Sequence, residues 1–407
     1  MSNLSLPGPL PAEDRTGRVL AIGVVLGVVG TLLAIAFKWR CGIPAGLEGQ
    51  YLQICYSDVP PLFFAERLDV GAVPYLDHPV EYPPLTGLWM WLAALPSTTA
   101  AAFFGWTSAL FVVSGGIVGG LLARTVGVRR TLVFAAAPTL WVSGAVNWDL
   151  PSLALATAGL VAHRWGRDGW AGTWLGLGTA AKLWPALLLP AVVLGAGTVR
   201  GRAAGIRTAL TAVGAWALVN LPVALAAPDG WLRFLELNRE RPADWDSLWR
   251  IVPGWVGADL EVATLNLAGA TVTLVGCAVL LLLAVRWDPP QQWHLVALPL
   301  IAWFLLANKV WSPQFSLWLL PLLALATPPI WTLVAFFLAD VAVTFTRFPY
   351  LGGFVGIEDA GSAAAFETAV VVRAVLVVVV AVWGWRRAVG PPAPTTTRLR
   401  LQPGARA

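Results

Sequence analysis

The feature that most constrains this chain is a succession of apolar runs separated by short polar segments. Residues 19–37 form the first run, and about 20 apolar residues suffice to cross a bilayer. The mean hydropathy is +0.71. Only 12% of the 407 residues are charged, about half the density of an average soluble protein. These values exclude a soluble enzyme and predict an all-α, polytopic membrane protein with about 11 to 13 transmembrane helices.

The apolar runs after the first one locate the other expected spans. One interval is ambiguous: residues 83–124 are long enough for two spans, or for one span and a partly inserted helix. We favour the second arrangement, because two spans would carry the Arg124–Arg130 cluster to the opposite side of the membrane. The further spans are expected near 84–123, 131–146, 149–163, 171–181, 184–197, 205–226, 262–285, 293–307, 312–327, 329–346 and 369–383.

The positions of the arginines predict the orientation. Short Arg clusters between apolar runs are typical of cytoplasmic loops, so both tails, residues 1–17 and 387–407, are expected inside. They flank one transmembrane domain of residues 18–386. The two long polar intervals, 38–82 and 227–261, then lie on the outer side of the plasma (inner) membrane. Within the second interval, the apolar spacing of residues 231–241 predicts an interfacial helix that breaks at Pro242.

Composition also limits the cofactors and partners. Three Cys and three His are scattered along the chain, so no Cys/His metal site or haem attachment is expected. No glycine-rich phosphate loop follows a strand, so the sequence does not support ATP-driven transport by this chain alone. The net charge of +5 comes from arginines in loops between apolar runs. Such arginines mark the cytoplasmic side of a membrane protein, so we expect no nucleic-acid partner. Cys41 and Cys55 both lie in the first outer interval, where a disulfide is possible, and Cys277 lies in an apolar run.

Three polar clusters stand directly beside apolar spans, where ionisable groups are costly and therefore tend to be functional. All three are expected on the outer side. The first contains Asp58, Asp77, His78 and Glu81; the second contains Asn147 and Asp149; the third contains Lys182, Lys309, Trp311 and Gln314.

These residue types suit the transfer of a phosphate-linked group. A carboxylate such as Asp58, Glu81 or Asp149 can accept a proton from a hydroxyl. Cations can neutralise a phosphate leaving group, and the candidates are Lys182, Lys309 and either Arg239 or Arg241.

Each candidate also has a structural alternative. Asp149 is equally placed to cap the helix that follows it, and Asp58 to cap a helix or lie in a solvated loop. The two lysines can extend to the membrane interface. Arg373 and Asp340, in late spans, are candidates for a structural ion pair.

Tryptophan is abundant, with 23 residues, many of them near span ends. Interfacial anchoring explains such a distribution. The alternative is a set of flat platforms for sugar rings, and the candidates for that role are Trp148, Trp245, Trp249 and Trp311.

Taken together, the motifs resemble those of the C-superfold membrane glycosyltransferases, above all the family-87 polyprenol-phosphate-mannose-dependent mannosyltransferases. The resemblance rests on an Asp soon after the first span, Pro-Tyr…Glu-Tyr-Pro-Pro-Leu, Asn-Trp-Asp, Lys-Leu-Trp-Pro and Ser-Pro-Gln-Phe-Ser-Leu-Trp-Leu-Leu-Pro. It covers residues 18 to 346. Each motif is short, and only the set is specific.

The resemblance implies a C-type glycosyltransferase fold with outer-face loops and interfacial helices. It further implies transfer of a sugar from a polyprenyl-phosphate donor to a lipid or glycan hydroxyl, with inversion, on the extracytoplasmic face. Asp58 matches the family's catalytic base, Glu81 and Asp149 match cavity-lining positions, and Lys182 matches a lysine near the donor phosphate. Val59 follows Asp58 where many members of the superfamily carry paired acids, so a divalent metal is not supported.

Two other classes of function stay open. A secondary transporter also hides ionisable groups among broken helices, although inverted repeats typical of transporters are not evident and the acidic residues gather in the outer intervals. A non-catalytic protein of the same fold that binds polyprenyl lipids would share every motif, but Asp58 would then be dispensable.

Overall fold

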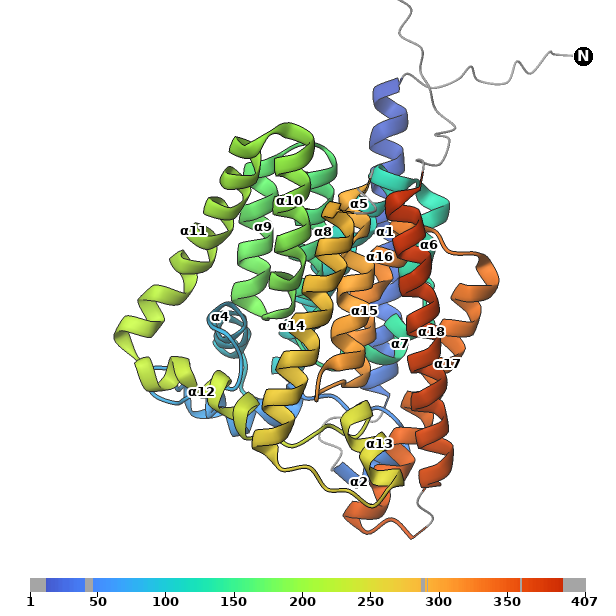
Figure 1. The fold of residues 1–407 in the computed structure, drawn as a ribbon. Helices are drawn as coiled ribbons and strands as arrows, with labels where there is room; N and C mark the ends of the chain where they lie inside the picture. Colours follow the sequence, from blue (N-terminus) through green and yellow to red (C-terminus); the bar gives the residue numbers. More distant parts are fainter. Residues whose placement is uncertain (1–11, 41–46, 287–289, 291, 359–360, 391–407) are drawn as a thin grey trace, which may run out of the picture.

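The computed structural model describes residues 12–40, 47–286, 290, 292–358 and 361–390, and regular structure in these ranges is helical (Figure 1). Six helices are long and apolar enough to cross a membrane, which confirms the predicted all-α, polytopic class. These helices are α1 (Ala12–Trp39), α5 (Ala100–Val126), α11 (Arg202–Ala226), α14 (Val262–Arg286), α17 (Ile330–Gly352) and α18 (Ala363–Val389).

Several of the shorter helices lie between the long ones and follow the same general direction (Figure 1). Several are joined end to end, and proline marks the joints: Pro138 begins α7, Pro185 lies in the first turn of η2 and Pro313 begins η4. Proline lacks a backbone N–H, so it is tolerated in a first turn but interrupts a continuing helix. The shorter elements are α6 (Val128–Ala135), α7 (Pro138–Ser143), α8 (Asp149–Arg164), α9 (Asp168–Ala181), η2 (Trp184–Leu188), α10 (Leu189–Arg200), η3 (Trp293–Leu295), α15 (Ala297–Ala307), η4 (Pro313–Trp318) and α16 (Leu319–Ala326).

The ambiguous interval 83–124 contains one long helix and one short helix. α4 (Pro84–Ala94) has 11 residues, a length of about 16 Å, which is too short to cross the hydrocarbon. Figure 1 shows α4 end-on, so it lies across the direction of the other helices. α5 alone spans the full depth, which is the arrangement that the Arg124–Arg130 cluster favoured.

Close helix packing depends on small residues. A Cβ at Gly27 of α1 would overlap the carbonyl of Gly115 on α5, and a Cβ at Gly119 would overlap the carbonyl of Gly23. The small-xxx-small spacing on both helices lets their backbones touch, which is how helices associate tightly where lipid weakens the hydrophobic effect.

One end of the helix bundle carries most of the loop structure. The elements at this end are α2 (Leu47–Leu52), α3 (Val59–Ala65), η1 (Leu68–Val70), α12 (Pro228–Glu240), α13 (Leu248–Trp255) and η5 (Gly353–Val355). Helix α12 ends at Glu240, just before the break predicted at Pro242.

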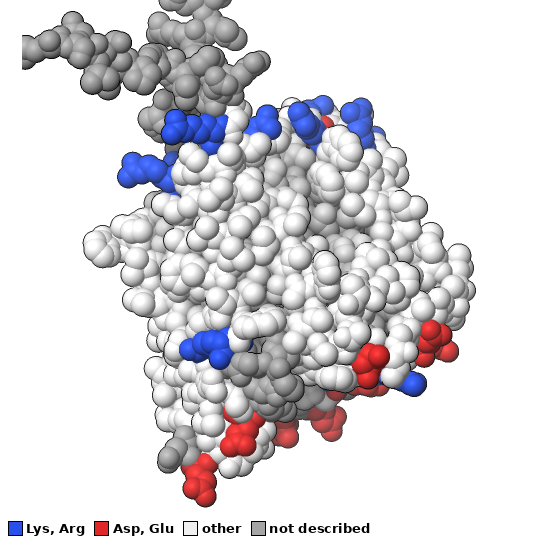
Figure 2. All heavy atoms as spheres, turned by 180° about the vertical axis from the view of Figure 1, so that it is seen from behind, with Lys and Arg blue, Asp and Glu red and all other residues white. Residues whose placement is uncertain are grey.

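The two ends of the molecule differ in charge. Figure 2 shows Lys and Arg gathered at one end and Asp and Glu at the other. The basic end carries residues such as Arg124, Arg164 and Arg200, which lie in the last turns of α5, α8 and α10. The loop-rich end is the acidic one.

The cysteines are placed as follows. Cys55 is disulfide-bonded, and the predicted pairing with Cys41 falls outside the described residues. Cys277 is a free, half-buried thiol in α14.

Candidate active site

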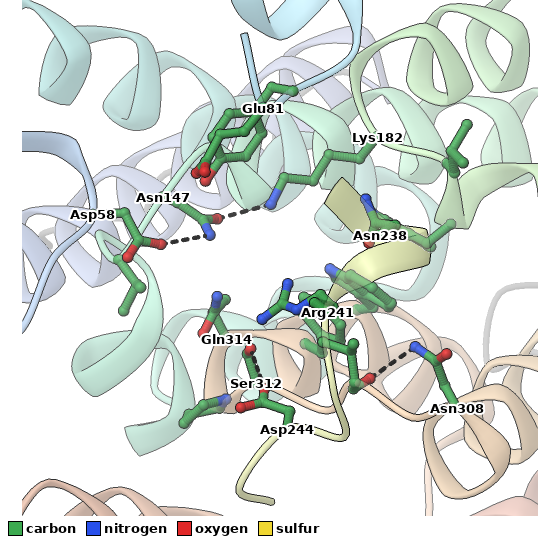
Figure 3. A pocket seen from close by; sticks show the side chains of 18 of the residues that line it. Asp58, Glu81, Asn147, Lys182, Asn238, Arg241, Asp244, Asn308, Ser312 and Gln314 are labelled. Atoms are coloured by element: carbon green, nitrogen blue, oxygen red, sulfur yellow. Dashed lines mark hydrogen bonds between the residues drawn. The ribbon is translucent and has the colours of Figure 1, made fainter. Parts of the chain in front are cut away.

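A cavity of about 720 Å³ opens at the acidic end of the molecule. It lies where broken helices and loops meet, so its polar side chains come from segments far apart in the sequence (Figure 3). Asp58, Glu81, Asn147 and Lys182 form one wall, and Arg241, Asp244, Ser312 and Gln314 face them.

Asp58 is held from two directions. Its backbone N–H donates to the carbonyl of Val146 over 2.8 Å, which ties the first loop to the turn before α8. Its carboxylate accepts hydrogen bonds from Asn147 Nδ2, at 3.1 Å, and from the Tyr56 hydroxyl. Asp58 occupies the N-cap position of α3, but its side chain makes no capping hydrogen bond. The carboxylate therefore faces the cavity and does not serve as a helix cap.

Asn147 connects this carboxylate to a cation. Its Oδ1 accepts from Lys182 Nζ over 2.8 Å while its Nδ2 donates to Asp58, so both ends of the amide have fixed roles. Lys182 Nζ also donates to Asp149 Oδ2 over 2.9 Å. An ammonium carries three donors, and these two bonds leave one N–H for a ligand.

Asp149 orients the lysine and does not cap its helix. It lies in the first turn of α8 with its carboxylate buried. One oxygen accepts from Lys182, and the other accepts from Trp318 Nε1 over 2.8 Å. The Trp318 ring in turn stacks on Trp184 with centroids 4.9 Å apart. Asp149 thus joins the lysine to an aromatic wall of the cavity.

The two carboxylates facing the cavity from this wall have raised pKa values. Burial raises the pKa of Asp58, although hydrogen bonds from Tyr56 and Asn147 and the charge of Lys182 oppose the rise. Burial together with the nearby carboxylates of Asp58 and Glu66 raises the pKa of Glu81 to about 7. A carboxylate with a raised pKa is a stronger base when it is ionised.

The opposite wall is built on a loop after α12. Arg241 directs its guanidinium into the cavity (Figure 3), and its carbonyl accepts from Lys309 Nζ over 2.5 Å. Asp244 accepts from Ser312 Oγ over 2.7 Å and pairs with Arg347 at 3.3 Å. Burial alone would raise the pKa of Asp244, but Arg347 and Ser312 outweigh it and hold the pKa below its usual range.

Beyond the polar walls, the cavity becomes apolar. Three apolar side chains of the amphipathic helix α12 line it together with side chains from α15, from η2 and from the residue before η2. These residues are Leu183, Leu187, Phe234, Leu235, Leu237 and Phe304. The cavity therefore has the shape and polarity to hold an amphiphile, with its charged group between Lys182 and Arg241.

The structure brings together seven of the predicted site residues and places the other five elsewhere. Six of the seven line the cavity, namely Asp58, Glu81, Asn147, Lys182, Arg241 and Gln314, and the seventh, Asp149, binds Lys182.

The other five have different surroundings. Lys309 is buried and binds the Arg241 carbonyl, and Arg239 is exposed on α12. Asp77 accepts from the N–H of Val73 in its own loop, and His78 lies 3.4 Å from Glu66. Trp311 is fully buried under the guanidinium of Arg373.

Several cavity residues were not predicted from the sequence. Tyr56 and Tyr82 flank candidates that were named, and both line the cavity. Arg347 lies near the end of α17 and Trp318 lies in η4, so only the fold places these two residues at the site. One signal was available in the sequence: Trp318 belongs to the same Ser-Pro-Gln motif as Gln314.

No group of three or more His, Cys, Asp or Glu side chains converges in the described ranges so as to hold a metal ion. Independence of a metal stays a prediction. Among the described residues, the cations that face the cavity are those of Lys182, Arg241 and Arg347.

Comparison with known proteins gave two findings. The family model of glycosyltransferase family 87 matches residues 81–313, which include most of the cavity residues. Among solved structures, the chain is similar to ArnT from Cupriavidus metallidurans bound to undecaprenyl phosphate, with 14% identity and a TM-score of 0.43 over 93% of this chain and 78% of that one. No curated protein matches the sequence.

Proposed function

Because the chain belongs to glycosyltransferase family 87, we propose that it transfers a sugar from a polyprenyl-phosphate donor to the hydroxyl of an envelope glycolipid or glycan. Mannose is the donor sugar we expect, from the motifs shared with the mannosyltransferases of that family. The protein acts in the plasma membrane. Its charge asymmetry supports a cytoplasmic basic end and a cavity on the outer face.

One observation carries this proposal: a half-buried carboxylate and a lysine with a spare N–H are held by the same amide. Asp58 and Lys182 both bind Asn147, at 3.1 and 2.8 Å. A base and an anion-binding group are therefore fixed relative to one another before a substrate arrives. Fixed polar groups of this kind need little reorganisation during the reaction, which is the main source of electrostatic catalysis.

The proposed reaction is a single displacement. The acceptor hydroxyl gives its proton to the Asp58 carboxylate as its oxygen attacks the anomeric carbon. The bond between that carbon and the phosphate oxygen breaks, and the electron pair leaves with polyprenyl phosphate. Attack opposite the leaving group inverts the anomeric configuration.

Cations suit the departure of the phosphate leaving group. Lys182 and Arg241 face each other across the cavity and would stabilise the charge on the departing phosphate. The apolar wall formed by Phe234, Leu237 and Leu187 would hold the first isoprene units. Asp149 and Trp318 would act through Lys182 by fixing its direction.

The test is transfer by purified protein in liposomes, supplied with labelled polyprenyl-phosphate mannose and an envelope-lipid extract. Asp58→Asn should fold and lose transfer by about 100-fold or more, the effect of removing a general base. Asp69→Asn is the matched control, because Asp69 is an exposed acid of the same loop region. It should transfer sugar at the wild-type rate.

The outcomes separate the competing functions. Near-normal turnover by Asp58→Asn would remove this residue from the mechanism. Absence of product with mannose, arabinose and glucose donors, at full protein integrity, would favour a transporter or a carrier-binding protein. Donor binding without product would point to the carrier-binding protein.

A further inference from the structure

A second cavity, of about 520 Å³, opens between α5, α8 and α9. Its lining is almost entirely apolar, and small residues on α8 make it hollow: Ala154 and Ala158 are one helical turn apart and lie on the same face. We name it the α8 groove. It extends along α8 from Pro151 to beyond the end of that helix at Trp165, a length of about 20 Å. One leaflet of hydrocarbon is about 15 Å thick, so the α8 groove is long enough to take a lipid acyl chain.

The basic end of the α8 groove differs from the rest. Trp165, Arg167 and Trp170 line it there. The guanidinium carbons of Arg124 and Arg167 lie 5.4 and 5.8 Å from the centre of the Trp165 ring. Neither arginine is paired with a carboxylate in the part of the chain that the structure describes, and both are exposed. Two cations and two indole rings therefore stand where an apolar channel meets the membrane surface.

We propose that the α8 groove binds an anionic glycerophospholipid of the surrounding bilayer. Its phosphate would lie between Arg124 and Arg167, because each guanidinium can donate two parallel hydrogen bonds to phosphate oxygens. The indole rings of Trp165 and Trp170 would lie at the depth of the headgroup. One acyl chain would occupy the hollow over Ala154 and Ala158.

Two arguments favour this ligand. A zwitterionic lipid would offer the two arginines a phosphate already partnered by its own cation, so charge complementarity favours a net negative headgroup. The α8 groove also ends among the arginines of the basic end, whereas the candidate active site begins at Asp149 at the other end of α8. The lipid would therefore be a second ligand, separate from the donor and independent of the proposed reaction.

The experiment measures lipid retention by native mass spectrometry of the delipidated full-length protein. Phosphatidylglycerol and phosphatidylcholine with identical chains are titrated in parallel. Wild type should retain phosphatidylglycerol at least 10-fold more strongly. The Arg124→Gln/Arg167→Gln variant should lose that preference, and Ala158→Trp, which fills the α8 groove, should lose the high-affinity lipid.

Matched controls separate the α8 groove from general effects of charge and bulk. Arg129→Gln/Arg130→Gln removes two exposed arginines from the same end on α6 and should keep the preference. Leu210→Trp adds bulk to an exposed position of α11 and should keep the lipid. Thermal midpoints confirm folding, and Ala158→Leu replaces Ala158→Trp if the latter is unstable.

Some results would overturn the proposal. Equal retention of the two lipids by wild type, or a preference that survives the double arginine change, would show that the α8 groove has no headgroup selectivity. Retention of polyprenyl phosphate in place of phosphatidylglycerol at equal concentrations, lost in Ala158→Trp, would assign the α8 groove to the isoprenoid chain instead.

Discussion

Two polar networks meet at the acidic end of this protein, and they are built differently. The first, the cavity network, joins Asp58, Asn147, Lys182 and Asp149. The second, the clamp, joins Asp244, Asp246, Arg347, Arg373 and Asp340 beneath the loop that follows α12.

The clamp leaves no carboxylate oxygen without a donor. Asp246 pairs with Arg347 and with Arg373. Asp340 accepts from Thr139 and Ser316 and lies 3.7 Å from Arg373, the ion pair that the sequence predicted. The clamp thus fastens the loop to α17 and α18.

In the cavity network, some hydrogen-bond donors and acceptors are unused. Lys182 has an N–H to spare, and the carboxylate of Glu81 accepts no hydrogen bond from the described residues. The pKa directions agree with this difference: the pKa of Glu81 is raised to about 7, while that of Asp244 is held low by Arg347. In the clamp every carboxylate oxygen has a donor, which favours rigidity, whereas the cavity network has a lysine N–H and a carboxylate available for a substrate.

Breaking the clamp should have the largest effect on stability. Arg373→Met leaves the carboxylates of Asp246 and Asp340 buried without their shared cation, and removing one partner of a buried pair costs about 3 to 5 kcal/mol. We expect a lower thermal midpoint in detergent. Transfer per folded molecule should stay near that of wild type. An unchanged midpoint would contradict the role of the clamp.

Opening the cavity network at Lys182 should affect binding. Lys182→Met removes the N–H that faces the cavity, and a charge-assisted hydrogen bond contributes about 1.5 to 3 kcal/mol. Donor affinity should therefore fall by about 10-fold or more. Arg239→Met is the matched control and should leave donor affinity unchanged, because Arg239 is an exposed cation of α12 that does not line the cavity. Equal donor affinity in wild type and Lys182→Met would return Lys182 to a structural role.

The smallest effect concerns pH. Asp58 must be ionised to act as a base, so activity should fall as the pH drops through its pKa. The charge of Lys182 favours that ionisation, because it lowers the pKa of Asp58. Lys182→Met should therefore raise the pKa of Asp58 and move the acid limb of the pH–rate profile up by ~0.5 unit. Glu236→Gln, on the exposed face of α12, should leave the limb in place. An acid limb that moves down would refute the coupling.

The sequence by itself determined the class of fold and most of its spans. The apolar runs depend only on local composition, and a bilayer requires each of them to satisfy its own backbone hydrogen bonds. The break at Pro242 and the short helix at 84–94 follow from chain chemistry and length in the same way. The outer motifs also identified Asp58, Asn147 and Lys182, because charges beside apolar spans are rare and costly.

Only the tertiary structure decided which of those charges face one another. Lys182 and Lys309 look alike in sequence, since each precedes an apolar residue, a tryptophan and a nearby proline. Yet one faces the cavity and the other holds a loop. Arg347 and Trp318 reach the site from distant helices, and no local pattern encodes such a meeting. Side-chain partners depend on how helices pack in three dimensions, and packing is a property of the whole chain.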